Sequence, residues 1–165
     1  MLILSDLTKK NIIIKFKMMV SLLFATLIDQ YSFFHFLPFQ PSFTIITLFY
    51  WTFFFEYHMS FVVVFFLGLL TDILGGSLLG ENTFVLLAFY AGISFYREYF
   101  TERSQYEWAI LWGSTIVILC VHFLLIWAIH KRIFFCIDPV IGHFFSLLFY
   151  PSLKRVMFWF VGEEE

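Results

Sequence analysis

One acidic residue is a candidate for chemistry because of the apolar sequence around it. Between Glu56 and Glu81 the only residue with a formal charge is Asp72, within the stretch FFLGLLTDILGGSLLG. A carboxylate inside a membrane is costly, so its presence is by default a functional-site hypothesis. Such a group can act as a catalyst, a proton carrier, a ligand or ion site, or a polar joint between helices.

The sequence offers few partners for catalysis or proton transfer. It contains no GxSxG, no HExxH, no glycine-rich phosphate loop and no paired aspartates that could hold magnesium. Asp29 is the one further acid expected near the same depth, and His122 and His130 are spaced as a packing pair would be on one helix face. We therefore expect no enzyme activity, no cofactor and no bound metal. A structural joint at Asp72 is favoured, with a ligand or ion site and catalysis left open.

The composition identifies the class of protein. The 165 residues are 61% hydrophobic and 13% charged, with a mean hydropathy of +0.88, whereas soluble domains carry about 25% charged residues. This predicts a single transmembrane domain over residues 1–165, surrounded by membrane lipid. There is no basic block that could follow a phosphate backbone, so nucleic acid is not expected as a partner. Cys120 and Cys136 lack CxxC spacing, and their side chains are expected to face lipid or to fill the core rather than to form a disulfide or bind a metal.

Apolar runs predict the fold class: an all-α, polytopic bundle of about six transmembrane helices. The second, third and fourth runs are short and separated by tight turns, which predicts that they form one hairpin-like core of antiparallel neighbours. The six runs are residues 12–28, 42–55, 60–75, 83–95, 108–129 and 140–160.

The distribution of lysine and arginine predicts the orientation. With six spans and a cytoplasmic N-terminus, eight basic residues fall inside and two, Lys131 and Arg132, fall outside. This predicts a bacterial inner-membrane protein with both termini in the cytoplasm. The first span is expected to be uncleaved, with Lys15 and Lys17 snorkelling to one interface, and Met18 or Met19 is an alternative start. The inside residues are Lys9, Lys10, Lys15, Lys17, Arg97, Arg103, Lys154 and Arg155.

The polar segment REYFTERSQYE, residues 97–107, lies on the predicted cytoplasmic side. It is expected to be a solvated loop, and the alternative is a docking surface for a cytoplasmic partner.

Glycines surround Asp72 at helical spacing. In a helix over residues 60–76, Gly68, Asp72 and Gly76 share one face, with Gly75 beside them. Small residues allow a second helix to approach closely, so this face is expected to point into the bundle. A carboxylate near the C-terminal end of a helix is disfavoured, and we expect either protonation or the N-terminal amides of the next helix, near Asn82 and Thr83, to compensate.

The order of these features resembles the bacterial rod-shape-determining MreD family. The family pattern is an Arg-Pro, a run ending in Tyr-Trp, then Gly-x-x-x-Asp-x-x-x-Gly-x-x-x-Gly. Two departures are Gln40 in place of the arginine and Tyr150–Pro151 in place of a Trp-Pro pair. The matching residues, expected to have structural or packing roles, are Pro41, Tyr50, Trp51, Gly68, Asp72, Gly76, Gly80 and Tyr90, together with Pro151.

The resemblance implies a non-enzymatic scaffold of the cell-elongation complex, which supports peptidoglycan synthesis and cell shape. Its implied partners are the bitopic protein MreC, the glycan polymerase RodA with its transpeptidase and, indirectly, actin-like MreB filaments. The fold is implied to be similar to the substrate-binding components of energy-coupling-factor transporters. Tyr50 and Trp51 would then lie near the inner interface, as an ordinary aromatic belt or as a partner contact.

That fold similarity keeps a second function open: the substrate-binding membrane subunit of a vitamin or metal importer. It predicts a pocket open to the outside and lined by polar side chains from several spans. The candidates are Asp29, Gln30, His35, Asp72, Glu81 and Asn82.

Overall fold

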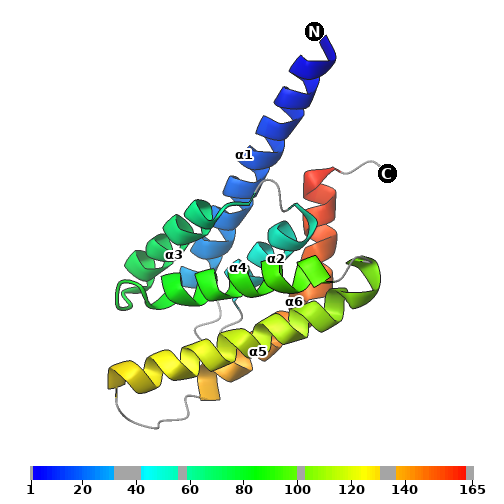
Figure 1. The fold of residues 1–165 in the computed structure, drawn as a ribbon. Coiled ribbons are helices and arrows are strands. Elements are labelled where there is room, and N and C mark those ends of the chain that lie inside the picture. Colours follow the sequence, from blue (N-terminus) through cyan, green and yellow to red (C-terminus); the bar gives the residue numbers. More distant parts are fainter. Residues whose placement is uncertain (1, 32–41, 56–58, 100–102, 131–136, 163–165) are drawn as a thin grey trace.

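The computed structural model contains six helices in the part of the chain that it describes, residues 2–31, 42–55, 59–99, 103–130 and 137–162. The all-α class and the positions of all six expected runs are confirmed. The helices are α1 (Leu2–Gln30), α2 (Phe43–Phe54), α3 (Phe61–Gly75), α4 (Glu81–Tyr99), α5 (Arg103–His130) and α6 (Ile137–Val161) (Figure 1).

Length and apolar character make the structure a membrane helical bundle. Three helices contain stretches long and apolar enough to cross a bilayer: Lys9–Gln30 of α1, Tyr106–Leu125 of α5 and Gly142–Val161 of α6. Helices α2 and α3 are also apolar but shorter. Of these two, α2 is surrounded by neighbouring helices, whereas α3 buries one face and exposes apolar side chains such as Phe66 on the other.

Helix α2 is the centre of the bundle. All of its residues from Thr44 to Phe53 are buried, and it packs against α1, α4 and α6. The expectation that Tyr50 and Trp51 form an aromatic belt or a partner contact is therefore wrong. They are 1% and 0% exposed, and the Trp51 indole Nε1 donates a hydrogen bond of 2.7 Å to Ser21 Oγ on α1. Neighbouring helices, rather than lipid, therefore surround α2.

The neighbours of α3 also differ from expectation. It makes its main contacts with α4 and α1, and α4 lies between α3 and α5 while also touching α2 (Figure 1). The predicted hairpin-like core of α2, α3 and α4 in sequence order is therefore wrong in one respect: α1, not α2, is the second neighbour of α3. The antiparallel α3–α4 pair is present, because the turn between them is short.

The first and last helices meet at one end of the bundle. The Lys17 ammonium group donates a hydrogen bond of 2.9 Å to the Val161 carbonyl and lies 5.7 Å from the centre of the Phe160 ring. A cation at the C-terminal end of a helix stabilises its dipole. Lys17 thus ties α1 to α6 as well as reaching toward an interface, while the start of α1 extends beyond the other helices (Figure 1).

Candidate functional site

Asp72 is fully buried, with 0% of its surface exposed, in the last turn of α3. Its carboxylate accepts hydrogen bonds from the Gly80 amide at 2.8 Å, the Asn82 amide at 2.8 Å and the Thr83 hydroxyl at 2.7 Å. Two longer bonds come from the Ser77 hydroxyl at 3.1 Å and the Thr83 amide at 3.4 Å. All of these donors lie in the turn after α3 or in the first turn of α4.

These contacts make Asp72 a cap for the helix that follows its own. The first amides of α4 have no partner within that helix, and an anion there is stabilised by the helix dipole. The unfavourable position of the carboxylate at the C-terminal end of α3 is offset in this way. The Asn82 and Thr83 amides, the compensating groups considered from the sequence, both donate to it.

The glycines near Asp72 act in two different ways. At Gly68 a methyl group would clash with the Thr83 backbone and would lie 2.9 Å from Thr83 Oγ1, so α3 and α4 approach closely there. Gly76 does not continue the helix face, which corrects the expectation. It ends α3 with a φ of 64°, and Gly80 has a φ of 102°. Nothing lies within 4 Å of a Cβ placed at either residue, so both serve the turn conformation.

Replacing Gly68 with alanine is expected to lower the free energy of unfolding by about 1–3 kcal/mol, because the added methyl group forces the α3 and α4 backbones apart. Thermal unfolding in detergent measures the change. Gly113→Ala is the matched control, since nothing lies within 4 Å of a Cβ at that helical position. Equal stability of the two variants would contradict close packing at Gly68.

Asp29 forms a second cap of the same kind, which the sequence analysis did not identify. It lies in the last turn of α1 and accepts hydrogen bonds from the Phe43 amide at 2.8 Å and the Thr44 amide at 2.9 Å. The Ser42 hydroxyl donates a longer bond of 3.4 Å. Ser42, at the N-cap position of α2, makes no side-chain cap bond of its own. Asp29 therefore supplies the missing cap from the preceding helix.

The two caps lie at the same end of the bundle. Gln30, next to Asp29, places its side-chain nitrogen 3.5 Å from the Thr71 carbonyl, next to Asp72, and its amide also lies close to Gly75. The shared sequence signal is an acid in the last turn of one apolar run followed by Ser or Thr at the start of the next. Two occurrences of this pattern, rather than one, could have indicated both joints.

A polar cavity of about 240 Å³ lies between the two caps. Of the candidates for an importer pocket, Asp29 and Asn82 line it; Asp72 is not part of the lining, and His35 is outside the described residues. His122 and His143 line the cavity from α5 and α6, and the side chain of His130 is outside the described residues. The lining is completed by Ser42, Thr44, Ile45, Thr71, Val85 and Leu86.

A second buried carboxylate, Glu107, joins α5 to α6. It is 6% exposed, accepts a hydrogen bond from the Tyr150 hydroxyl, and pairs with the Lys154 ammonium group at 2.6 Å. The expectation of a solvated loop over residues 97–107 is therefore wrong at Glu107. Helix α4 extends to Tyr99 and α5 begins at Arg103, so most of this segment is helical.

The remaining residues of the family pattern have varied surroundings. Tyr90 is partly buried against the core in the middle of α4, not at its end. Pro151 is exposed inside α6, next to the buried Tyr150. Pro41 is outside the described residues. Among the side chains that the structure describes, no set of three or more His, Cys, Asp and Glu is placed to hold a metal ion.

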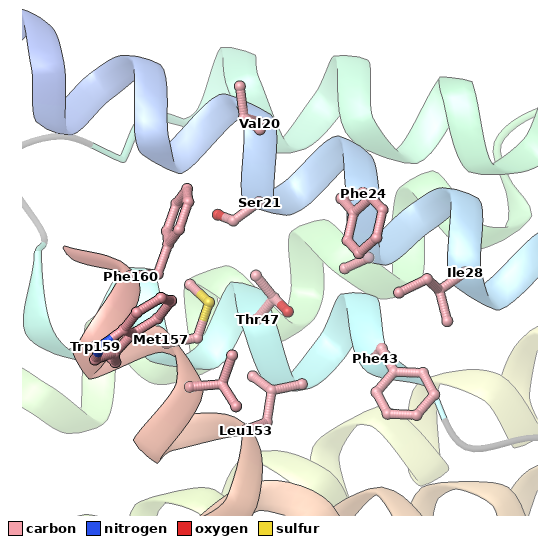
Figure 2. A pocket seen from close by; sticks show the side chains of 12 residues that line it. Val20, Ser21, Phe24, Ile28, Phe43, Thr47, Leu153, Met157, Trp159 and Phe160 are labelled. Atoms are coloured by element: carbon pink, nitrogen blue, oxygen red, sulfur yellow. The ribbon is translucent and has the colours of Figure 1, made fainter.

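An apolar groove of about 380 Å³ runs between α1, α2 and α6 (Figure 2). Figure 2 shows Phe24, Met157 and Phe160 around it, with Ser21 and Thr47 as its hydroxyl-bearing residues. The Ser21 hydroxyl accepts the hydrogen bond from Trp51. The groove is therefore a surface suited to hydrocarbon.

Comparison with known proteins identifies the family of this membrane helical bundle. The profile of the family described as "rod shape-determining protein MreD" matches residues 10–163. No curated protein and no solved structure matches the chain. The family match covers nearly the whole chain, including α1 from residue 10 onward, the other five described helices, the carboxylates Asp29, Asp72 and Glu107, and the cavity. The chain therefore belongs to the MreD family of rod shape-determining proteins.

Proposed function

We propose that this protein is a non-enzymatic membrane scaffold of the bacterial cell-elongation complex. Membership of the MreD family gives it a role in rod-shape determination. The observation that carries the scaffold proposal is the use made of Asp72. All five of its hydrogen bonds come from the turn after α3 and the first turn of α4, as expected of a group that fixes helices in place rather than one that reacts.

The exposed surface supports the same proposal. Large apolar side chains such as Phe66, Phe84 and Trp159 are exposed, at 64%, 56% and 85%. In a bilayer these surfaces meet lipid or the spans of other proteins. The proposed partners are a bitopic MreC-like protein, a RodA-like polymerase with its transpeptidase and, indirectly, MreB filaments.

We also propose that both termini face the cytoplasm. The Lys17–Val161 contact supports this, because it places the end of α6 beside the middle of α1, and the first half of α1 extends from there on the same side of the bundle (Figure 1). The excess of lysine and arginine there favours the cytoplasmic side. The proposed location is the inner membrane, with the Asp29 and Asp72 caps at its outer side.

Depletion of the protein in rod-shaped cells is expected to make them round, and the wild-type gene supplied in trans is expected to restore rods. Cell width and length measured by microscopy test this. A pull-down from membranes in mild detergent then tests the partners. Depleted cells that keep their width and shape would contradict the proposal, whatever the pull-down contains.

The polar cavity favours a second candidate, the substrate-binding subunit of a small-solute importer. It has polar groups from all six described helices, as such a subunit needs. Uptake of a labelled vitamin or metal that stops on depletion, in cells that remain rods, would favour this candidate. A neighbouring gene for a single-span coiled-coil protein, beside one for an actin-like protein, would favour the scaffold.

A further inference from the structure

We propose that the cavity between the Asp29 and Asp72 caps binds a small, uncharged, hydrogen-bonding molecule of about one ring, held by His122 and His143. The inference goes beyond the scaffold role and does not rest on it, because binding is a property of the bundle itself. A ligand here would contact residues from all six described helices, because the cavity lining includes side chains from each of them.

The two imidazoles carry the inference. His143 is 9% exposed, and its Nε2 has no hydrogen-bond partner among the described residues. His122 is half-buried, and its Nδ1 also has no hydrogen-bond partner among the described residues. The ring centres are 6.1 Å apart, with the rings inclined by 55°, and both side chains line the cavity.

A buried ring nitrogen that has no hydrogen-bond partner in the protein can gain one from a bound molecule. Buried polar groups in native proteins almost always have a hydrogen-bond partner, from protein or from bound molecules. A buried polar group without a partner lowers the stability of the folded protein. Two such nitrogens belong to side chains that line one polar cavity from different helices. This arrangement of a few polar groups around a small hollow is typical of ligand sites.

The size of the cavity sets the size of the ligand. At about 240 Å³ it is larger than a cavity of about 150 Å³ that holds benzene. It is smaller than the range of about 300–1,000 Å³ that suits drug-sized ligands. The cavity therefore suits a molecule with a single polar ring, larger than benzene and smaller than a typical drug.

The charges around the cavity favour an uncharged ligand. Asp29 is the one formally charged residue among the described lining residues. Helices α2 and α4 begin beside the cavity, at Phe43 and Glu81, and their positive ends offset its negative charge, so neither an anion nor a cation gains a net attraction. A neutral imidazole has one donor and one acceptor nitrogen, which matches an amide or a nitrogen heterocycle that has both.

The test uses the full chain purified in mild detergent. The probes are nicotinamide and uracil, which are uncharged single rings with donors and acceptors. Benzoate, benzylamine and zinc chloride are the anionic, cationic and metal comparisons. Equilibrium dialysis and thermal unfolding are expected to show saturable binding of nicotinamide or uracil, with a raised Tm, and no saturable binding of the other three.

Variants assign the binding to the two histidines. His143→Phe and His122→Phe are each expected to weaken binding at least tenfold, whereas His143→Gln keeps a donor and an acceptor and is expected to retain part of it. Ser114→Ala is the control, because Ser114 is buried on α5 but is not part of the lining and bonds its own helix at Leu111.

Several results would overturn the proposal. One is the absence of saturable binding for both uncharged probes. Another is binding of benzoate or benzylamine as tightly as the uncharged rings, or saturable binding of zinc alone. If the phenylalanine variants do not fold, unchanged binding in folded His143→Gln together with His122→Gln would count against it equally.

Discussion

Replacing Asp72 with leucine is expected to lower the free energy of unfolding by roughly 3–5 kcal/mol, the largest single effect in the bundle. Leucine has the same branched shape as aspartate and a larger volume, but it accepts no hydrogen bond. The amides of Gly80 and Asn82 would then be left without their partner at 2.8 Å, as would the Thr83 hydroxyl. Thermal unfolding in detergent is expected to show a fall in Tm on the order of 10 °C.

Two further variants separate hydrogen bonding from charge at this position. Asp72→Asn keeps one acceptor oxygen and is expected to lose less stability than Asp72→Leu. Ser77→Ala removes one of the longer bonds to Asp72, at 3.1 Å, together with the bond of 3.0 Å that the Asn82 side chain donates to Ser77 Oγ. It keeps the three short bonds to Asp72 and is expected to stay within about 1–2 kcal/mol of the wild type. Equal losses for Asp72→Asn and Asp72→Leu would show that the charge itself stabilises the joint and would contradict the hydrogen-bonding account.

Replacing Asp29 with leucine is expected to cost roughly 2–4 kcal/mol, the second-largest effect. The two strong bonds to the Phe43 and Thr44 amides would be lost, and the N-cap residue Ser42 makes no side-chain cap bond to replace them. Some order at the start of α2 is expected to remain, because the Ser42 amide still donates to Ser146 Oγ at 2.7 Å.

Amide hydrogen exchange measures the loss of each cap at individual residues. In Asp29→Leu the amides of Phe43 and Thr44 are expected to exchange faster, whereas those of Gly80 and Asn82 remain protected. Asp72→Leu is expected to show the reverse pattern, so each variant is the control for the other. Faster exchange at both helix starts in both variants would show that the two caps act as one unit.

Several features could be predicted from the sequence with good accuracy. The class of protein, the six helices and the family follow from apolar runs and from an ordered motif, all of which are local in the chain. The position of Asp72 near the end of α3 could also be inferred, and so could the Asn82 and Thr83 amides as its partners. All three residues lie within eleven residues of each other, so these contacts are local in the chain.

Other features depend on contacts between distant residues. The aromatic pair Tyr50–Trp51 suggested an interface, yet α2 is enclosed by three helices, and nothing in its composition distinguishes lipid neighbours from protein neighbours. Gly76 fits a helix face by spacing, but its backbone is left-handed and ends the helix. Glu107 looked solvated because its partners, Tyr150 and Lys154, are more than forty residues away.

The sequence by itself determined that this is a membrane protein of six helices in the MreD family, because hydrophobic runs and short motifs are properties of neighbouring residues. Only the tertiary structure decided that Asp29 repeats the role of Asp72, that α2 is the core, and that His122 and His143 face one cavity. The physical reason is that burial and hydrogen bonding depend on which helices pack together, and apolar helices of similar composition can pack in many orders.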